Sequence, residues 1–300
     1  MSEITTDTEP DTPSPRSTRI RHRKVFAVLP TLLTLCNAAC GFGAISIAGT
    51  ELITAAYLIF LAMLFDALDG SAARFTNQTS DFGAQLDSLS DSISFGVAPA
   101  FIMLQLIHPD HHLMNTVVNA PFNYHPRILW AIGVLFMWCA LLRLARFNVE
   151  SDEEDSHDFF SGLPSPAAAG VVASFPIAIW ELKEETKVDG VLAWAHPVAP
   201  YLLPSLVVLL PLITLAAAML MVSRIRYAHL FNQMMRGRRS RRQMRLIVFA
   251  MVLAFVVREM AVPVLFCGFA FASPLRAFWE RYYLKLYKNK TPLPEETKSV

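Results

Sequence analysis

The sequence carries little charge for its length, which excludes the ordinary composition of a soluble domain. Only 17% of the 300 residues are charged, whereas 54% are hydrophobic; soluble domains carry about 25% charged residues. Glycine and proline make up about a tenth of the chain, which excludes a collagen or a low-complexity polymer. The net charge of +1 identifies no class of partner. We therefore expect a membrane protein.

Cysteine is scarce as well. The chain has four cysteines and no CxxC pair: Cys36, Cys40, Cys139 and Cys267. All of them lie in apolar stretches, where cysteine packs as a small apolar residue. This pattern excludes a secreted disulfide framework.

Long uncharged runs dominate instead. About 20 apolar residues are needed to cross the hydrocarbon core of a bilayer, and the candidate runs are 25–47, 52–65, 93–107, 128–142, 167–180 and 201–222. Residues 246–272 are apolar apart from Arg258 and Glu259. We interpret this last run as two short helices joined by a tight turn, with one long span as the alternative. The sequence predicts an all-α, polytopic membrane bundle with a six-helix core and eight membrane helices in total.

The apolar runs divide the chain into five parts. We expect a disordered N-terminal tail over 1–24, a membrane core over 25–222, a basic loop over 223–245, two membrane helices over 246–275 and a C-terminal tail over 276–300. The tails are polar, with little apolar surface to bury.

Basic residues predict the orientation in the membrane. Residues 16–24 and 224–245 are rich in arginine, whereas 108–126 contain no lysine or arginine. Because cytoplasmic loops carry the excess of these residues, we expect both termini on the cytoplasmic side of the inner cell membrane. Beside a membrane helix, the arginines of 236–245 favour anionic lipid over nucleic acid as a partner. His108, His111 and His112 fall in the loop assigned to the outside, which we interpret as solvated.

Four aspartates stand where apolar runs end or begin: Asp66, Asp69, Asp87 and Asp91. The first two are three residues apart and the last two are four apart, so each pair shares one face of a helix. Residues 75–82 are polar and predict a short reversal. The two helices would then return side by side, and the four carboxylates would converge.

Converging carboxylates repel one another unless a cation lies between them. Their oxygens suit the hard ions Mg²⁺ and Mn²⁺, and two such ions can clamp a diphosphate. Gly70 has no side chain, so a ligand can approach the helix backbone there. The guanidinium N–H groups of Arg74 can donate hydrogen bonds to a phosphate. Acidic residues within membrane segments mark functional sites. The residues alone predict a divalent-metal site for a phosphorylated or diphosphate substrate at the cytoplasmic face.

The segment 66–91 has the pattern DxxDGxxAR, eight residues, then GxxxDxxxD, and it resembles the signature of the CDP-alcohol phosphatidyltransferases. The resemblance implies displacement of CMP from a CDP-linked lipid by an alcohol, a divalent metal and a homodimer. It implies that Asp66, Asp69 and Asp87 are metal ligands. It also implies that Asp91 is the general base and contacts a second ion. The implied CDP pocket is lined by Thr34, Asn37, Gly70, Ala73, Arg74 and Gly83.

Three softer segments, 143–148, 159–170 and 223–227, resemble bacterial phosphatidylserine synthases of the integral-membrane type. This resemblance implies CDP-diacylglycerol and L-serine as substrates. The residues expected to hold serine or a lipid phosphate are Arg143, Arg146, Ser161, Ser165, Arg224 and Arg226. Other interpretations stay open: the arginines of 143–148 also fit membrane anchors, and residues 162–166 also fit a turn that enters a helix.

The same residues also fit other functions. Within the family, glycerol 3-phosphate or an inositol phosphate is the alternative acceptor alcohol. An intramembrane prenyltransferase also holds a diphosphate with aspartates, but it divides them between two distant motifs. An ion-coupled transporter places its acids near the bilayer midplane, whereas these four lie where the apolar runs end or begin.

Overall fold

The computed structural model describes residues 15–76, 80–108, 124–151, 160–185, 199–223, 225–227 and 261–288. Its membrane-crossing part is built from helices α1 (Pro15–Ile47), α2 (Leu52–Thr76), α3 (Asp81–Asp91), η1 (Ser92–Val97), α4 (Ala98–Ile107), α5 (Pro126–Ser151), α6 (Ser165–Glu185) and α7 (Ala199–Val222). A further helix, α10, covers Ala261–Lys288. Two strands of two residues each, β1 (Phe160–Ser161) and β2 (Arg226–Tyr227), pair antiparallel. The predicted all-α fold is confirmed apart from this short pair.

Six segments of the described residues are long and apolar enough to cross a membrane: Val28–Ile47, Leu52–Ala73, Asp81–Ile107, Pro126–Val149, Ser165–Lys183 and Leu202–Val222. The third is α3, the π-helical turn η1 and α4 in continuous succession. The predicted multi-pass bundle with six core helices is therefore confirmed. The predicted total of eight stays a prediction, because residues 246–260 lie outside the described residues and α10 holds a shorter apolar stretch, Val262–Arg276.

Several helices extend beyond their apolar runs. Helix α1 begins at Pro15 and so includes residues 15–24, part of the predicted N-terminal tail; proline suits the first turn of a helix, and arginine and lysine are good helix formers. Helix α10 continues to Lys288, so residues 276–288, predicted as tail, are helical too, over a stretch without glycine or proline. The reversal predicted over 75–82 is shorter, because α2 ends at Thr76 and α3 begins at Asp81.

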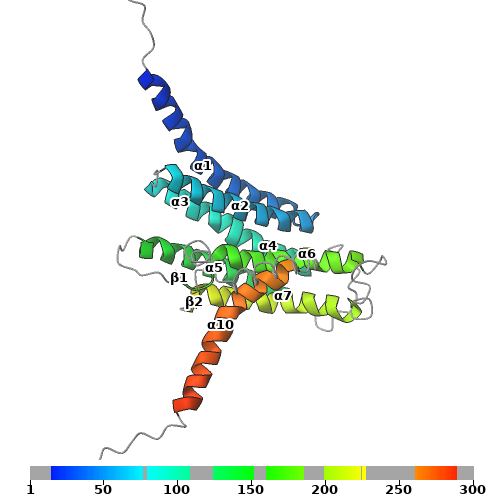
Figure 1. Ribbon diagram of the computed structural model, residues 1–300. Helices are drawn as coiled ribbons and strands as arrows, with labels where there is room; N and C mark the ends of the chain where they lie inside the picture. Colours follow the sequence, from blue (N-terminus) through cyan, green and yellow to red (C-terminus); the bar gives the residue numbers. More distant parts are fainter. Residues whose placement is uncertain are drawn as a thin grey trace, which may run out of the picture.

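The helices form two groups that meet along α4 and α6. In Figure 1, α1, α2 and α3 lie side by side, α5 and α7 lie on the other side, and α10 crosses the bundle obliquely. Helix α6 is the most enclosed of the six spans and packs against α2, α7 and α10. Small buried residues on it, such as Ala169 and Ala173, let these neighbours approach. Large apolar side chains such as Leu32, Trp130 and Leu212 remain exposed on the outer faces, as a lipid-facing surface requires.

Successive spans alternate in direction. The C-terminal ends of α2, α5 and α7 and the N-terminal ends of α3 and α6 therefore lie at the same end of the bundle. The segment before α6 is tied to this end. Gly162 N–H donates to the carbonyl of Ile225 at 2.9 Å, and Leu163 N–H to that of Leu220 at 3.0 Å. Gly162 has a φ of 90° and lies against the carbonyl of Met221, which only glycine accommodates without strain. We call this end the aspartate end, because both pairs of aspartates lie there.

Helix α10 docks on α6 at a glycine. A Cβ on Gly170 would overlap the ring of Phe266, and that ring lies 5.5 Å from the ring of Phe60 on α2. The absence of a side chain at Gly170 is therefore what lets α10 pack here.

We predict that Gly170→Ala lowers the thermal midpoint of the detergent-solubilised protein, because overpacking costs about 1–3 kcal/mol. Adding Phe266→Leu should restore much of the loss. The control is Gly268→Ala on α10, where an added Cβ meets nothing within 4 Å. Equal midpoints for the two glycine variants would contradict this packing.

Candidate active site

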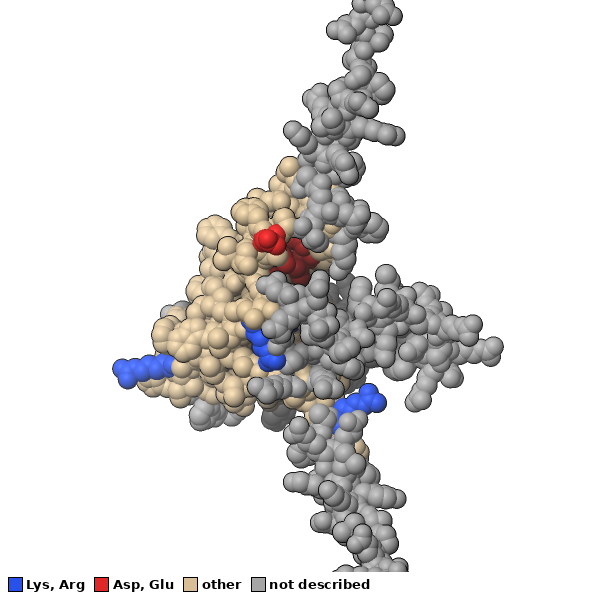
Figure 2. Space-filling model, turned by 90° about the vertical axis from the view of Figure 1, so that its left-hand side faces the viewer, with Lys and Arg blue, Asp and Glu red and all other residues tan. Residues whose placement is uncertain are grey.

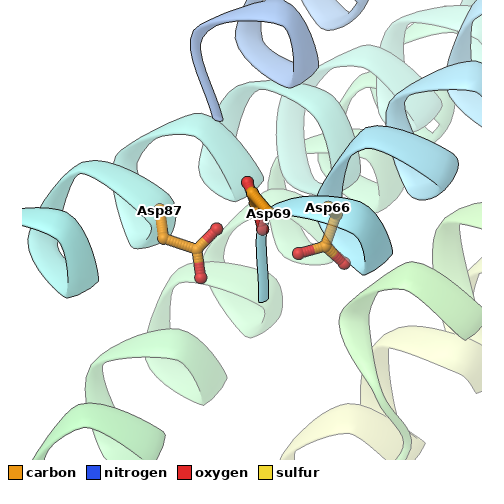
Figure 3. A group of neighbouring side chains, drawn as sticks. All are labelled: Asp66, Asp69 and Asp87. Atoms are coloured by element: carbon orange, nitrogen blue, oxygen red, sulfur yellow. The ribbon is translucent and has the colours of Figure 1, made fainter. Parts of the chain in front are cut away.

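Three of the four predicted carboxylates converge in the structure. Asp66 and Asp69 lie one turn apart on α2, Asp87 lies on α3, and one carboxylate oxygen from each lies within 4.8 Å of those from the other two. Figure 3 shows the carboxylate of Asp69 between those of Asp66 and Asp87. The short reversal between α2 and α3 is what brings these groups together.

The start of α3 is fixed by its own cap. Ser80 has extended backbone and its hydroxyl accepts a hydrogen bond from Gly83 N–H at 3.1 Å. Asp81 follows in the first turn, where its negative charge interacts favourably with the helix dipole. A Cβ on Gly83 would lie 3.2 Å from the Ser80 hydroxyl. This local contact gives Gly83 a role in the cap, in addition to the predicted place beside CDP, which stays a prediction.

The carboxylate group can bind a metal ion. Asp69 Oδ2 and Asp87 Oδ1 are buried and have no hydrogen-bond partner among the described residues. Buried carboxylate oxygens are costly unless they are paired or coordinate a cation. A set of oxygen ligands alone fits a hard divalent ion and not a structural zinc site.

Asp91 lies one helical turn beyond Asp87 and outside the group of three. It is only 7% exposed, and its Oδ1 accepts a hydrogen bond from Asn37 Nδ2 of α1 at 3.0 Å. It lies within electrostatic range of all three other aspartates. Its predicted role as the general base stays a prediction.

The other residues predicted for the CDP pocket lie on α1 and α2 beside the aspartates. Thr34 is buried, its hydroxyl donates to the carbonyl of Pro30 at 3.0 Å, and it lies within hydrogen-bonding reach of the Asp69 carboxylate. Among the described residues, nothing lies within 4 Å of where a Cβ on Gly70 would be, and its predicted place beside CDP stays a prediction. Ala73 follows on α2, and the side chain of Arg74 lies outside the described residues.

The predicted acceptor residues are only partly brought together. Arg143 of α5 is half-buried, and its Nη1 donates to the hydroxyl of the buried Ser165, the first residue of α6, at 2.8 Å. Its Nε is buried without a hydrogen-bond partner among the described residues, and its charge lies within electrostatic range of Asp91. Arg146 is exposed.

The remaining three acceptor candidates are described less fully. Ser161 and Arg226 belong to the paired strands, with side chains outside the described residues, and Arg224 lies wholly outside them.

Sequence reasoning missed two serines. Ser88 lies between Asp87 and Asp91 and exchanges hydrogen bonds with Asn148 of α5, at 2.9 and 3.1 Å. Ser94 of η1 donates to the main-chain carbonyl of Asn37 at 2.8 Å. The available signal was the run of serines at alternate positions from 88 to 94, which is unusual at the start of an apolar span.

Acidic side chains are visible together at the aspartate end. In Figure 2, which faces this end, they form one small, partly recessed patch, and the basic side chains drawn in blue lie apart from it. Such a group of carboxylates can hold divalent cations, and through them a diphosphate.

Several known proteins are similar to this chain. An archaetidylserine synthase of Methanothermobacter thermautotrophicus is 42% identical over 154 residues, which is 50% of this chain and 58% of the relative. A CDP-diacylglycerol–serine O-phosphatidyltransferase of Helicobacter pylori is 36% identical over 146 residues (48% and 55%). Another protein of that name, from Methanocaldococcus jannaschii, is 35% identical over 153 residues (51% and 62%). The chain thus spans roughly half to three-fifths of the length of these relatives.

The match to a family is broader. Residues 27–202 match the CDP-alcohol phosphatidyltransferase domain, which runs from within α1 to beyond the end of α6 and therefore includes every aspartate of the site. The pattern of residues 66–91, the converging carboxylates and this match agree. The chain belongs to the CDP-alcohol phosphatidyltransferase family.

Proposed function

We propose that this protein is a phosphatidylserine synthase, which transfers the phosphatidyl group of CDP-diacylglycerol to L-serine and releases CMP. The observation that carries the proposal is the buried Asp91 beside the three converging carboxylates, in a chain whose relatives are named for serine transfer. A prenyltransferase is not favoured, because the family match covers the whole aspartate site.

We propose that Asp66, Asp69 and Asp87 hold the divalent metal, Mg²⁺ or Mn²⁺, and that Asp91 completes the site for a second ion. The unpaired oxygens of Asp69 and Asp87 support this proposal. When bound, such ions neutralise the diphosphate and the charge that develops on the leaving CMP. Gly70, Ala73, Arg74 and Thr34 are the residues of this chain that would border the cytidine diphosphate.

The chemistry at this chain's own residues is proton transfer and orientation. Asp91 accepts the proton of the serine hydroxyl as that oxygen attacks the phosphorus that carries diacylglycerol. The new bond joins serine to phosphorus, the bond from phosphorus to the bridging oxygen breaks, and CMP leaves with the electron pair. Helices α2, α3 and α5 hold the groups in place, and such positioning supplies much of the rate enhancement in phosphoryl transfer.

The acceptor is proposed to be recognised by Arg143 and Ser165. The Arg143 guanidinium donates a hydrogen bond to the Ser165 hydroxyl, has a buried Nε–H with no hydrogen-bond partner among the described residues, and lies within electrostatic range of Asp91. A carboxylate is the group that a guanidinium fork recognises best, and serine carries one next to its reactive hydroxyl. The predicted homodimer stays an implication of the resemblance.

We propose that the aspartate end faces the cytoplasm. Residues 16–24, which lead into the first membrane span, and residues 224–245, which follow α7, are arginine-rich, and both adjoin this end. Residues 108–126 adjoin the opposite end and contain no lysine or arginine. The positive-inside rule then places the site where serine and CDP-diacylglycerol are available.

The assay that tests the acceptor uses purified protein in vesicles with CDP-diacylglycerol and radiolabelled alcohols. We predict that L-serine is used and that kcat/KM for glycerol 3-phosphate is lower by several orders of magnitude. A site that hydrogen-bonds one substrate group discriminates strongly, because a different substrate leaves buried polar groups of the site without partners. Arg143→Ala should raise the KM for serine about tenfold or more and leave that for CDP-diacylglycerol nearly unchanged.

Arg146→Ala is the comparison on the same helix. Since Arg146 is exposed, we expect this variant to raise the KM for CDP-diacylglycerol and to leave that for serine nearly unchanged. Equal turnover of glycerol 3-phosphate and serine would instead indicate a phosphatidylglycerophosphate-type synthase.

Asp91→Asn should abolish turnover while CDP-diacylglycerol still binds, because an amide cannot accept the proton. The loss of a general base costs about 10²–10⁴-fold, and the added role at a second ion should make the loss larger. Turnover and lipid binding are measured on the same preparation, with Asp81→Asn, exposed in the first turn of α3, as the control. Near-normal activity of Asp91→Asn would rule out the base assignment.

Orientation is tested by labelling single added cysteines in intact cells with an impermeant reagent. We predict that a cysteine at Asn119 reacts and that one at Gln233 reacts only after permeabilisation. The unsubstituted protein, with its four native cysteines, gives the background. Labelling at Gln233 in intact cells would invert the proposed topology.

A further inference from the structure

Asn37 is held on two sides at the contact between α1 and the third span. Its side-chain Nδ2 donates to Asp91 Oδ1 at 3.0 Å, and its main-chain carbonyl accepts the Ser94 hydroxyl at 2.8 Å. Asn37 and Ser94 are both 0% exposed. One asparagine of α1 thus contacts the residues just before and within the π-helical turn η1.

The approach of the two helices is unusually close here. A Cβ on Gly41, one turn after Asn37 on α1, would overlap the hydroxyl and backbone of Ser94. Glycine at this position therefore lets η1 sit directly against α1. Since π-helical turns are rare and concentrate at functional sites, this contact calls for a role beyond packing.

The direction of the Asn37 amide is fixed by Asp91. Only the nitrogen end can face a carboxylate, because the amide oxygen would be repelled. The other end, Asn37 Oδ1, is buried and has no hydrogen-bond partner among the described residues. One of the two N–H groups of the Asn37 amide is therefore committed to Asp91.

We propose that Asn37 is a positioning residue for Asp91, and that Ser94 holds Asn37 in place through the main-chain carbonyl. The amide occupies Oδ1 and thereby presents Oδ2 to the acceptor hydroxyl. This inference rests on the proposed role of Asp91 as the proton acceptor. It assigns Asn37 a role toward Asp91, the proposed proton acceptor, whereas the family resemblance implies a contact with the nucleotide.

The variants separate the two roles. Asn37→Asp keeps the shape and an acceptor oxygen but removes the donor, and Asn37→Ala removes both. We expect each to lower kcat about 10–100-fold, as the loss of a supporting hydrogen bond to a functional group does. The KM for CDP-diacylglycerol and the affinity for CMP, measured by calorimetry, should stay within about twofold, because positioning acts on turnover and not on nucleotide binding.

Ser94→Ala removes the hydrogen bond from Ser94 to the main-chain carbonyl of Asn37 without changing a residue proposed to contact substrate. It remains informative if the Asn37 variants fold poorly. We expect kcat to fall about three- to tenfold, and the double variant with Asn37→Ala to be no worse than Asn37→Ala alone, because residues that act as one unit are not additive. The matched control is Ser174→Ala, a serine that is also 0% exposed and whose hydroxyl donates to the carbonyl of Val171 at 2.7 Å within α6.

The outcomes are distinct. A loss of CMP affinity in Asn37→Ala with kcat preserved, or a Ser94→Ala variant indistinguishable from Ser174→Ala, would overturn the inference. The wild-type protein is assayed in parallel with serine and with glycerol 3-phosphate. If it uses only glycerol 3-phosphate, the proposed serine synthase fails, and the kcat comparison with that acceptor still decides the role of Asn37.

Discussion

Four carboxylates close together at the end of an apolar helix bundle are the constraint on which the rest of the structure depends. Mutual repulsion and the loss of water both act against the group, so it persists only where the fold holds it and a cation can enter. All four lie on two helices joined by a short reversal, and three of them converge most closely. The cap at Ser80 fixes where the second helix begins, and the start of that helix determines where Asp87 and Asp91 lie.

The remaining spans support this pair of helices from both sides. Helix α1 contacts Asp91 and η1 through Asn37, whereas α5 contacts α3 through Asn148 and Ser88. Arg143 then links α5 to the first residue of α6. Among the described residues, these polar contacts lie at one end of a bundle whose outer faces are largely apolar, which suits a substrate with acyl chains in the lipid and a diphosphate at the interface.

Much of this arrangement follows from the sequence. The aspartate spacing predicts the convergence, and the uncharged runs predict the six spans, because both depend on helical periodicity and on the thickness of a bilayer. The partners of Asn37, Ser88 and Arg143 do not follow from it. These bonds join residues 22 to 60 positions apart, and the rotation of each helix about its axis, which tertiary packing sets, decides whether such residues meet. The extra turns of α1 and α10 escaped prediction for another reason: hydropathy reports where a helix leaves the membrane and not where it ends.

The most direct measurement is anomalous diffraction at the manganese edge from crystals grown with Mn²⁺ and CMP. We predict that manganese is found among the carboxylates of Asp66, Asp69 and Asp87, with any second ion next to Asp91. Full occupancy of the nucleotide with no manganese at these carboxylates, or manganese bound only elsewhere, would contradict the claim that the aspartates form the metal site.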